Sequence, residues 1–178
     1  MLKLRDSVPR FDSAAVVECE VVHLRWHQLH ANQNLVLLFD SIDEYFDRPN
    51  DLATLCNASS RFQTLQCKLA VICRDDEFEI LTWMNRLSAK VGSKPIGFPV
   101  IIDADNEIAS MYDMLSVDGP LWGHVIADSK GRVRSIAAHS FPVGLNIEEL
   151  IKCVASLHCC DVDRARKQHS IHCSDRHD

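Results

Sequence analysis

Short apolar runs recur along the chain, and segments with a helical spacing of apolar residues lie between them. The runs are rich in Val, Ile and Leu, and they comprise Leu35–Phe39, Leu69–Ile72, Val100–Ile102 and His124–Ala127. Continuous runs of this length are typical of strands that are covered on both faces of a sheet. The pattern therefore predicts a central sheet with helices on both sides.

Three helices are predicted between these runs. The first is capped by Asn50 or Asp51, the second begins after Asp75, and the third follows Asp105. Their apolar faces are predicted to hold Leu52, Leu55, Ser59 and Phe62 in the first, Phe78, Leu81, Trp83 and Leu87 in the second, and Ile108, Met111 and Tyr112 in the third. The alternation of strand and helix predicts an α/β sandwich.

A hairpin and a closing helix complete the predicted core. Val133–Ala138 is a predicted strand, and the last helix starts near Asn146, with Glu149 placed for a capping box. Its apolar face consists of Leu150, Ile151, Val154 and Leu157. After His158 the composition becomes polar and charged. We therefore expect one domain over residues 1–158 and a disordered, Cys/His-rich tail over residues 159–178.

Composition and charge narrow the possible functions. The chain has 178 residues, of which 47% are hydrophobic and 25% charged, as expected for one globular domain. A net charge of −6 without a basic stripe argues against nucleic acid or an acidic membrane surface as a partner. The first residues lack the apolar run of a signal peptide, and nowhere do about 20 apolar residues follow one another. We expect a cytoplasmic protein whose eight cysteines are free and mostly buried.

Several short motifs lie in order between Val8 and His158. Besides residues 35–62, a strand, a loop and a helix, they are Val8-Pro9-Arg10-Phe11, Asp75 to Asn85, Phe98-Pro99 with Asp103, Ile126 to Arg134, and Pro142-Val143-Gly144. From Val8 to His158 these motifs and their order resemble the peroxiredoxin family, and residues 35–62 resemble the strand, loop and helix of its active site. The resemblance is to typical two-cysteine members of the alkyl hydroperoxide reductase C and thiol-specific antioxidant type. It implies a thioredoxin-like α/β fold and, as the family reaction, thiol-dependent reduction of hydroperoxides.

The resemblance also shows that the catalytic positions of the family hold other residues in this chain. The family's loop reads Pro, three residues, Thr, two residues, Cys, Pro, and the cysteine thiolate attacks a peroxide oxygen. Here Ser41 stands at the first proline, Tyr45 at the threonine and Arg48 at the cysteine, whereas Pro49 is kept. Trp122 stands where the family has a distant arginine. Because a guanidinium stays protonated and is no nucleophile, these changes imply a pseudoenzyme.

Other cysteines of the chain are candidate replacements for the missing nucleophile. Cys56 lies about 12 Å along a helix from Arg48, and we expect it to be a packing residue rather than a reactive one. The same holds for Cys67, Cys73 and Cys153. The family's resolving cysteine would fall near Lys167, and the nearest thiol is Cys173. Cys56 and Cys173 remain the fallback thiols for residual peroxidase or disulfide activity.

The tail offers ligands for a metal ion. His158, Cys159 and Cys160, followed by His169, His172 and Cys173, supply the imidazole and thiolate groups that Zn²⁺ and Cu⁺ prefer. Their spacing matches no compact zinc motif. The expectation is an unstructured tail without metal, and no cofactor for the domain.

Two interpretations of the Arg48 side chain are open. In one it points into solvent or pairs with Asp47 or Asp51. In the other the old peroxide pocket, narrowed by Tyr45 and Trp122, binds a small anion at a helix N-terminus. The acidic residues of the loop lack the spacing of a calcium site and are expected to be solvated; they are Asp40, Asp43, Glu44, Asp47 and Asp51.

Three functional hypotheses follow. The first is a non-catalytic peroxiredoxin-like protein that binds or assembles with itself or with active peroxiredoxins, through the edge strand Val133–Ala138. The second is residual thiol redox activity through Cys56 or the tail thiols, with thioredoxin as a partner. The third is a metal-binding or thiol-buffering tail on an inert domain.

Overall fold

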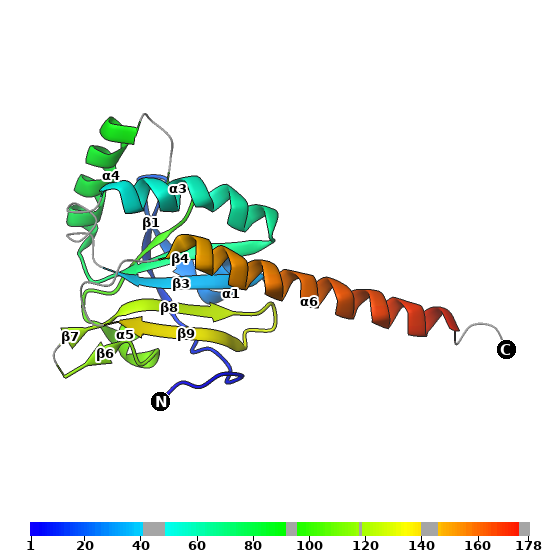
Figure 1. Ribbon diagram of the computed structural model, residues 1–178. Helices are drawn as coiled ribbons and strands as arrows, with labels where there is room; N and C mark the ends of the chain where they lie inside the picture. Colours follow the sequence, from blue (N-terminus) through cyan, green and yellow to red (C-terminus); the bar gives the residue numbers. More distant parts are fainter. Residues whose placement is uncertain (41–48, 92–95, 118, 140–145, 175–178) are drawn as a thin grey trace.

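A seven-stranded mixed sheet forms the centre of the computed structural model, which describes residues 1–40, 49–91, 96–117, 119–139 and 146–174. The strands follow the order β2-β1-β5-β4-β3-β8-β9 (Figure 1). Their bounds are β1 Asp12–Val17, β2 Glu20–Arg25, β3 Asn34–Asp40, β4 Cys67–Cys73, β5 Val100–Ile102, β8 Trp122–Ala127 and β9 Val133–His139. Strands β3, β4 and β5 are parallel, and the other pairs are antiparallel.

Helices cover both faces of this sheet. Their bounds are α1 Trp26–His30, α3 Pro49–Thr64, α4 Glu77–Val91, α5 Glu107–Met111 and α6 Ile147–Ser174, and a small ladder pairs β6 Leu115–Ser116 with β7 Gly119–Pro120. Helices α3, α4 and α6 pack on one face, and α1 and α5 pack on the other (Figure 1). The predicted α/β sandwich is therefore confirmed.

Strand β3 shows why the continuous apolar runs were informative. Val36 and Leu38 belong to the core under α3, α4 and α6, while Leu35, Leu37 and Phe39 belong to the core under α1 and α5. Side chains alternate between the two faces of a strand, so a strand buried on both sides needs apolar residues at every position. All four predicted runs lie within strands of this sheet, together with the predicted Val133–Ala138. The β1–β2 hairpin and helix α1 were not predicted.

The predicted faces of two helices need correction. Phe78 in α4 is 75% exposed, and the buried positions among the described side chains of this helix are Ile80, Trp83 and Met84, while the predicted Leu87 lies outside them. Phe78 lies in the first turn, two residues before Ile80, and that offset turns it about 200° away from the core. Met111 in α5 is 42% exposed for the same reason, since it lies two residues after the buried Ala109.

The predicted start of α4 agrees with the structure, and that of α3 does not. Helix α4 begins at Glu77, after Asp75, and Asp76 precedes its first residue: the Asp76 carboxylate accepts the backbone N–H of Glu79, and Glu79 Oε2 accepts the N–H of Asp76. This reciprocal pair is a capping box. Asn50 and Asp51, the predicted caps of α3, lie inside that helix, which the structure describes from Pro49. The cap of α6 is confirmed, since Asn146 Oδ1 accepts the N–H of Glu149 at 3.1 Å.

The last helix continues far beyond its predicted end. It runs to Ser174, so the prediction that residues 159–178 are disordered is wrong for 159–174 (Figure 1). No Pro or Gly interrupts the sequence between Ile147 and Ser174, and the helix can therefore extend on local propensity. Among its described side chains, the buried ones end at Val154. No helix in the described residues is long and apolar enough to cross a membrane.

Candidate functional site

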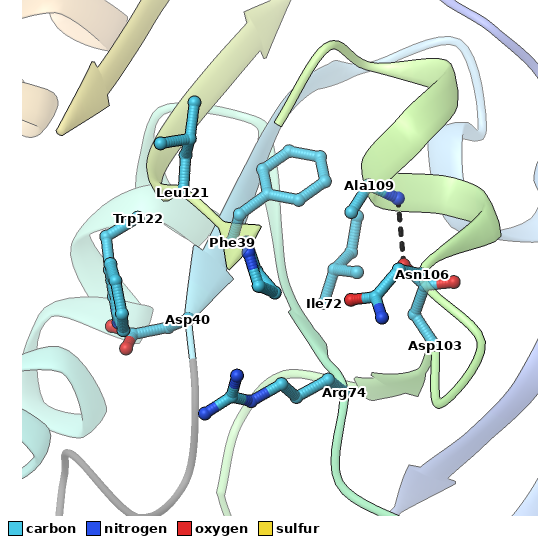
Figure 2. Close-up of a pocket in the computed structure, with 10 residues that line it drawn as sticks. Phe39, Asp40, Ile72, Arg74, Asp103, Asn106, Ala109, Leu121 and Trp122 are labelled. Carbon is cyan, nitrogen blue, oxygen red and sulfur yellow. Dashed lines mark hydrogen bonds between the residues drawn. The ribbon is translucent and has the colours of Figure 1, made fainter. Parts of the chain in front are cut away.

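A pocket opens at one edge of the sheet, where the parallel strands β3, β4 and β5 end. Asp40 is the last residue of β3, Arg74 follows β4 and Asp103 follows β5. The carboxyl ends of parallel strands share one edge of a sheet, and ligands commonly bind there. The pocket encloses about 340 Å³, open mouth included, and is lined by Phe39, Asp40, Ile72, Arg74, Asp103, Asn106, Ala109, Pro120, Leu121 and Trp122 (Figure 2).

The floor of this pocket is apolar and firmly packed. Phe39 and Ile72 are both less than 5% exposed and come from adjacent strands. The ring of Phe39 lies 5.5 Å from that of Tyr112, whose hydroxyl donates a hydrogen bond to the Pro9 carbonyl at 2.6 Å. The floor is thus fixed by contacts with a segment about a hundred residues away in the chain.

Asp103, which lies in the wall of this pocket, has a structural role. Its carboxylate accepts the backbone N–H groups of Ile108 and Ala109, at 2.9 and 2.8 Å (Figure 2 shows the bond to Ala109). These bonds satisfy amides at the start of α5 that have no partner inside the helix. Desolvation by burial raises the pKa of Asp103, and the hydrogen bonds from the amides of α5 oppose that rise. The carboxylate therefore serves as a cap rather than as a free acid or base.

Charge at the mouth comes from Arg74 and Asp40. Arg74 is exposed, and Figure 2 draws its guanidinium reaching toward the side where Asp40 and Trp122 lie. Arg74 is the one cationic residue among the described residues of the lining. Sequence analysis missed it, although its position directly after a buried parallel strand is a usable signal. The pocket thus combines an apolar floor with one positive charge at its mouth.

Trp122 belongs both to the predicted site and to the lining of this pocket. It is the first residue of β8, is partly buried, and lies beside Asp40 in Figure 2. Asp40 leads directly into the loop that contains Ser41, Tyr45 and Arg48, and these three predicted site residues lie outside the described residues. Pro49 is the first described residue of α3. Whether Arg48 binds an anion therefore stays a prediction.

The described cysteines differ in their surroundings. Cys56 is partly buried, and burial raises its pKa; desolvation also raises the pKa of Cys67 to about 12. Cys73 is buried and donates its thiol hydrogen to a carboxylate oxygen of Asp75. The surroundings of Cys56 and Cys67 therefore favour the protonated thiol over the thiolate.

The remaining described thiols correct the expectation of mostly buried cysteines. Cys19, Cys153, Cys159 and Cys160 are exposed, so only two of the seven described cysteines are buried. Cys153 was predicted to pack in the core, but it lies on the solvent side of α6. The stripe Leu150, Ile151 and Val154 faces the core instead.

The proposed metal ligands of the tail lie on one helix, α6, and those at Cys159 and Cys160 are exposed. The side chains of His169, His172 and Cys173 lie outside the described residues, so metal binding by the tail stays a prediction. Within the described residues no cluster of three potential ligands is found.

Comparison with known proteins gives consistent matches. The sequence model of the AhpC/TSA family matches residues 4–136. The chain is 24% identical to Peroxiredoxin-2 of Bos taurus over 155 residues, covering 86% of this chain and 77% of that protein. It is 27% identical to Peroxiredoxin-4 of Dictyostelium discoideum over 162 residues, covering 90% and 62%.

Solved structures agree with this at the level of the fold. The mitochondrial 2-Cys peroxiredoxin of Plasmodium falciparum superposes with a TM-score of 0.78 at 21% identity, over 90% of this chain and 96% of that one. AhpC of Mycobacterium tuberculosis gives a TM-score of 0.77 at 19% identity, over 88% and 93%. The predicted thioredoxin-like fold with a central mixed sheet is therefore confirmed.

Proposed function

Because the chain belongs to the AhpC/TSA family of peroxiredoxins, whose reaction is thiol-dependent hydroperoxide reduction, we propose that it is a non-catalytic member that acts by binding or assembly. The observation that carries the proposal is chemical. None of the described residues that line the pocket at the carboxyl edge of the sheet is a cysteine, and position 48 holds an arginine.

Peroxide reduction makes specific demands on a site. The nucleophile must be a thiolate at neutral pH, with a lowered pKa and donors that stabilise the departing oxygen. Arg48 supplies no nucleophile, and Trp122 occupies the wall position that the resemblance assigns to an arginine. The indole of Trp122 is larger than the arginine side chain that the resemblance places at this position, and it carries no charge. Loss of the nucleophile and of its partners supports a change of role rather than a single substitution.

The buried thiols support the same conclusion. Burial raises the pKa of Cys56 and raises that of Cys67 to about 12, so both are thiols near pH 7. The exposed thiols Cys153, Cys159 and Cys160 lie on α6. They are open to oxidation, but they lie outside the set of residues that lines the pocket.

Peroxidase activity is the direct test. Hydrogen peroxide consumption is measured with thioredoxin, thioredoxin reductase and NADPH for the unmodified protein, for Arg48→Cys, and for a triple variant with Arg48→Cys, Tyr45→Thr and Trp122→Arg. Arg48→Ser is the matched control, and bovine Peroxiredoxin-2 is the reference enzyme. We expect no turnover from the unmodified protein or from Arg48→Ser. Thioredoxin-dependent turnover by the unmodified protein would overturn the proposal, and substitution of Cys56 or Cys173 would then locate the thiol.

Assembly is the second half of the proposal, and strand β9 supports it. This strand lies at one end of the sheet and pairs with β8 on one side. On its other side the N-terminal segment covers only the beginning, since Arg5 N donates to the Val133 carbonyl and Val133 N donates to that of Asp6. Within the described residues the rest of this edge has no backbone partner, and such an edge favours pairing with another strand.

Sedimentation velocity tests assembly separately from activity. Ala138 is exposed on β9, and Ala138→Lys places a charge on the edge without opening the core. Ser156→Lys, at an exposed position of α6, is the control. We expect a dimer for the unmodified protein and the control, and a monomer for Ala138→Lys. A monomer at every concentration of the unmodified protein would exclude assembly through β9.

A further inference from the structure

A second pocket lies at the opposite edge of the sheet from the first. It opens between three parts of the chain: the end of α1, the N-terminal segment that contains Ser7, Val8 and Arg10, and the turn that joins β8 to β9. The turn at Asp128–Gly131 lies beside the beginning of β3, because β8 runs antiparallel to β3. The pocket holds about 670 Å³ of empty space, open mouth included, which is larger than the first.

The lining of this pocket is cationic. Arg10, His27, His30 and Lys130 contribute to it, and none of the described lining residues is Asp or Glu. The nearby carboxylate of Asp128 is already engaged with the N–H groups of Lys130 and Arg132 and with the guanidinium of Arg134 at 3.1 Å. Two permanent positive charges and two imidazoles thus line the pocket, in a chain whose net charge is −6.

His30 is held in one orientation in the wall. It is 6% exposed, its ring stacks on Trp26 with centroids 5.3 Å apart and an angle of 8°, and Nε2 lies 2.9 Å from the Asp128 carbonyl oxygen. A carbonyl oxygen only accepts, so Nε2 is the donor. Trp26 is itself anchored, because its backbone N–H donates to Asp12 Oδ1 at 2.9 Å. A wall fixed in this way binds a ligand with little loss of conformational entropy.

We propose that this pocket binds a phosphate group, either inorganic phosphate or the phosphate of a small ester. Arg10 and Lys130 are exposed and hold the anion from the mouth, and the hydroxyl groups of Ser7 and Ser129 add neutral donors to the same lining. A guanidinium and an ammonium together match the charge of a dianionic phosphate better than that of a single carboxylate. Because the pocket is open at its mouth, an organic group of a phosphate ester can extend from it into solvent.

The site is independent of the proposed non-catalytic role, because it shares no residue with the pocket at the carboxyl edge. Its described lining residues belong to the N-terminal segment, to α1 and the residues after it, and to the β8–β9 turn, and Arg48 is not among them. A protein with peroxidase activity and one without it would carry this pocket equally.

Isothermal titration calorimetry tests the site with two probes, inorganic phosphate and adenosine 5′-monophosphate, at constant ionic strength set with sodium chloride. We expect saturable binding of at least one probe, and an affinity at least tenfold weaker in Arg10→Ala and in Lys130→Ala. Lys152→Ala is the matched control, since Lys152 is exposed on α6, which packs on the other face of the sheet. Equal affinity for the two probes identifies the phosphate alone as the ligand, and tighter binding of the nucleotide identifies an ester.

Two results would overturn the proposal. One is the absence of saturable heat with both probes; the other is an equal loss of affinity in Lys152→Ala and Lys130→Ala. Because Arg10 and Lys130 are exposed, both variants are expected to fold, and circular dichroism melting curves check this. Raising the ionic strength should weaken the binding, as it does for charged groups near the surface.

Discussion

A Cβ atom on Gly123 would lie 2.0 Å from the backbone carbonyl oxygen of Ala137, on the neighbouring strand β9. Strands β8 and β9 run antiparallel here, with Gly123 paired to Ala138 and His124 to Ala137. Backbone atoms in a sheet cannot rotate away as a flexible side chain does. Glycine directly after Trp122 therefore allows β9 to approach the strand that contributes to the candidate pocket.

Gly123→Ala is expected to destabilise the protein. Inserting an extra methyl group into packed structure costs about 1–3 kcal/mol, and a contact with backbone places this change toward the upper end. The free energy of unfolding in urea measures the effect. Gly97→Ala is the control, because the nearest atom there is the side-chain oxygen of Ser59, at 2.8 Å, which can move. Equal losses in the two variants would contradict the explanation.

His124 should make stability depend on pH. Desolvation, followed by the nearby His139, lowers the pKa of His124 below 6.5. The unfolded chain therefore takes up this proton at a higher pH than the folded protein does. Stability is fully present above about pH 6.5 and is lost as the pH falls toward the lower pKa of the folded state.

Replacing this histidine removes the effect. The unfolding free energy of His124→Gln should change less between neutral and mildly acidic pH than that of the unmodified protein. His23→Gln, at an exposed position of β2, is the control and should keep the original slope. An unchanged slope in His124→Gln would rule out His124 as its source.

Asp103→Ala should loosen α5 and the wall of the candidate pocket. The change removes the acceptor of the Ile108 and Ala109 N–H groups, and loss of a capping side chain costs about 0.5–2 kcal/mol. Thermal unfolding measures the total loss, and amide hydrogen exchange should show faster exchange at Ile108 and Ala109. Asp105→Ala, at an exposed neighbouring position, should leave that exchange unchanged.

Thiol labelling should separate the cysteines by their surroundings. Alkylation by iodoacetamide at pH 8, mapped by mass spectrometry, is expected to modify Cys19, Cys153, Cys159 and Cys160 within minutes. Cys67, whose pKa is raised to about 12, should react only after unfolding in guanidinium. Labelling of Cys67 in the folded protein at the rate of Cys19 would show that the β4 strand opens readily.

Deleting residues 161–178 should leave the domain folded. Among the described side chains of α6, the buried ones end at Val154, and Leu157 is the last apolar one that packs against the core. The unfolding free energy should change little, while the circular dichroism signal of helix falls. A large loss of stability would mean that the extension of α6 contacts the domain and that the division near residue 158 is wrong.

The predictions that succeeded came from local patterns. A strand buried on both faces needs apolar residues at every position, so β3 and β4 were visible in the sequence. A helix of four turns such as α3 repeats its buried residues, as Leu55 and Phe62 do. Short elements carry fewer repeats, which is why α1 and the β1–β2 hairpin were missed. Phe78 misled because one apolar residue in a first turn looks like the start of a buried stripe.

The order of residues along the chain was enough to establish the sandwich of helices and sheet, the family resemblance and the absence of a cysteine at position 48, because each of these is encoded by neighbouring residues or by their order. The contacts between distant residues became known from the folded chain alone. Arg74 and Asp103 come together because the parallel strands β4 and β5 end at one edge, and Trp122 joins them because the antiparallel strand β8 begins there. Arg10 and Lys130 share a pocket although 119 residues lie between them. Such proximity depends on the packing of strands and turns, and no local period along the chain records it.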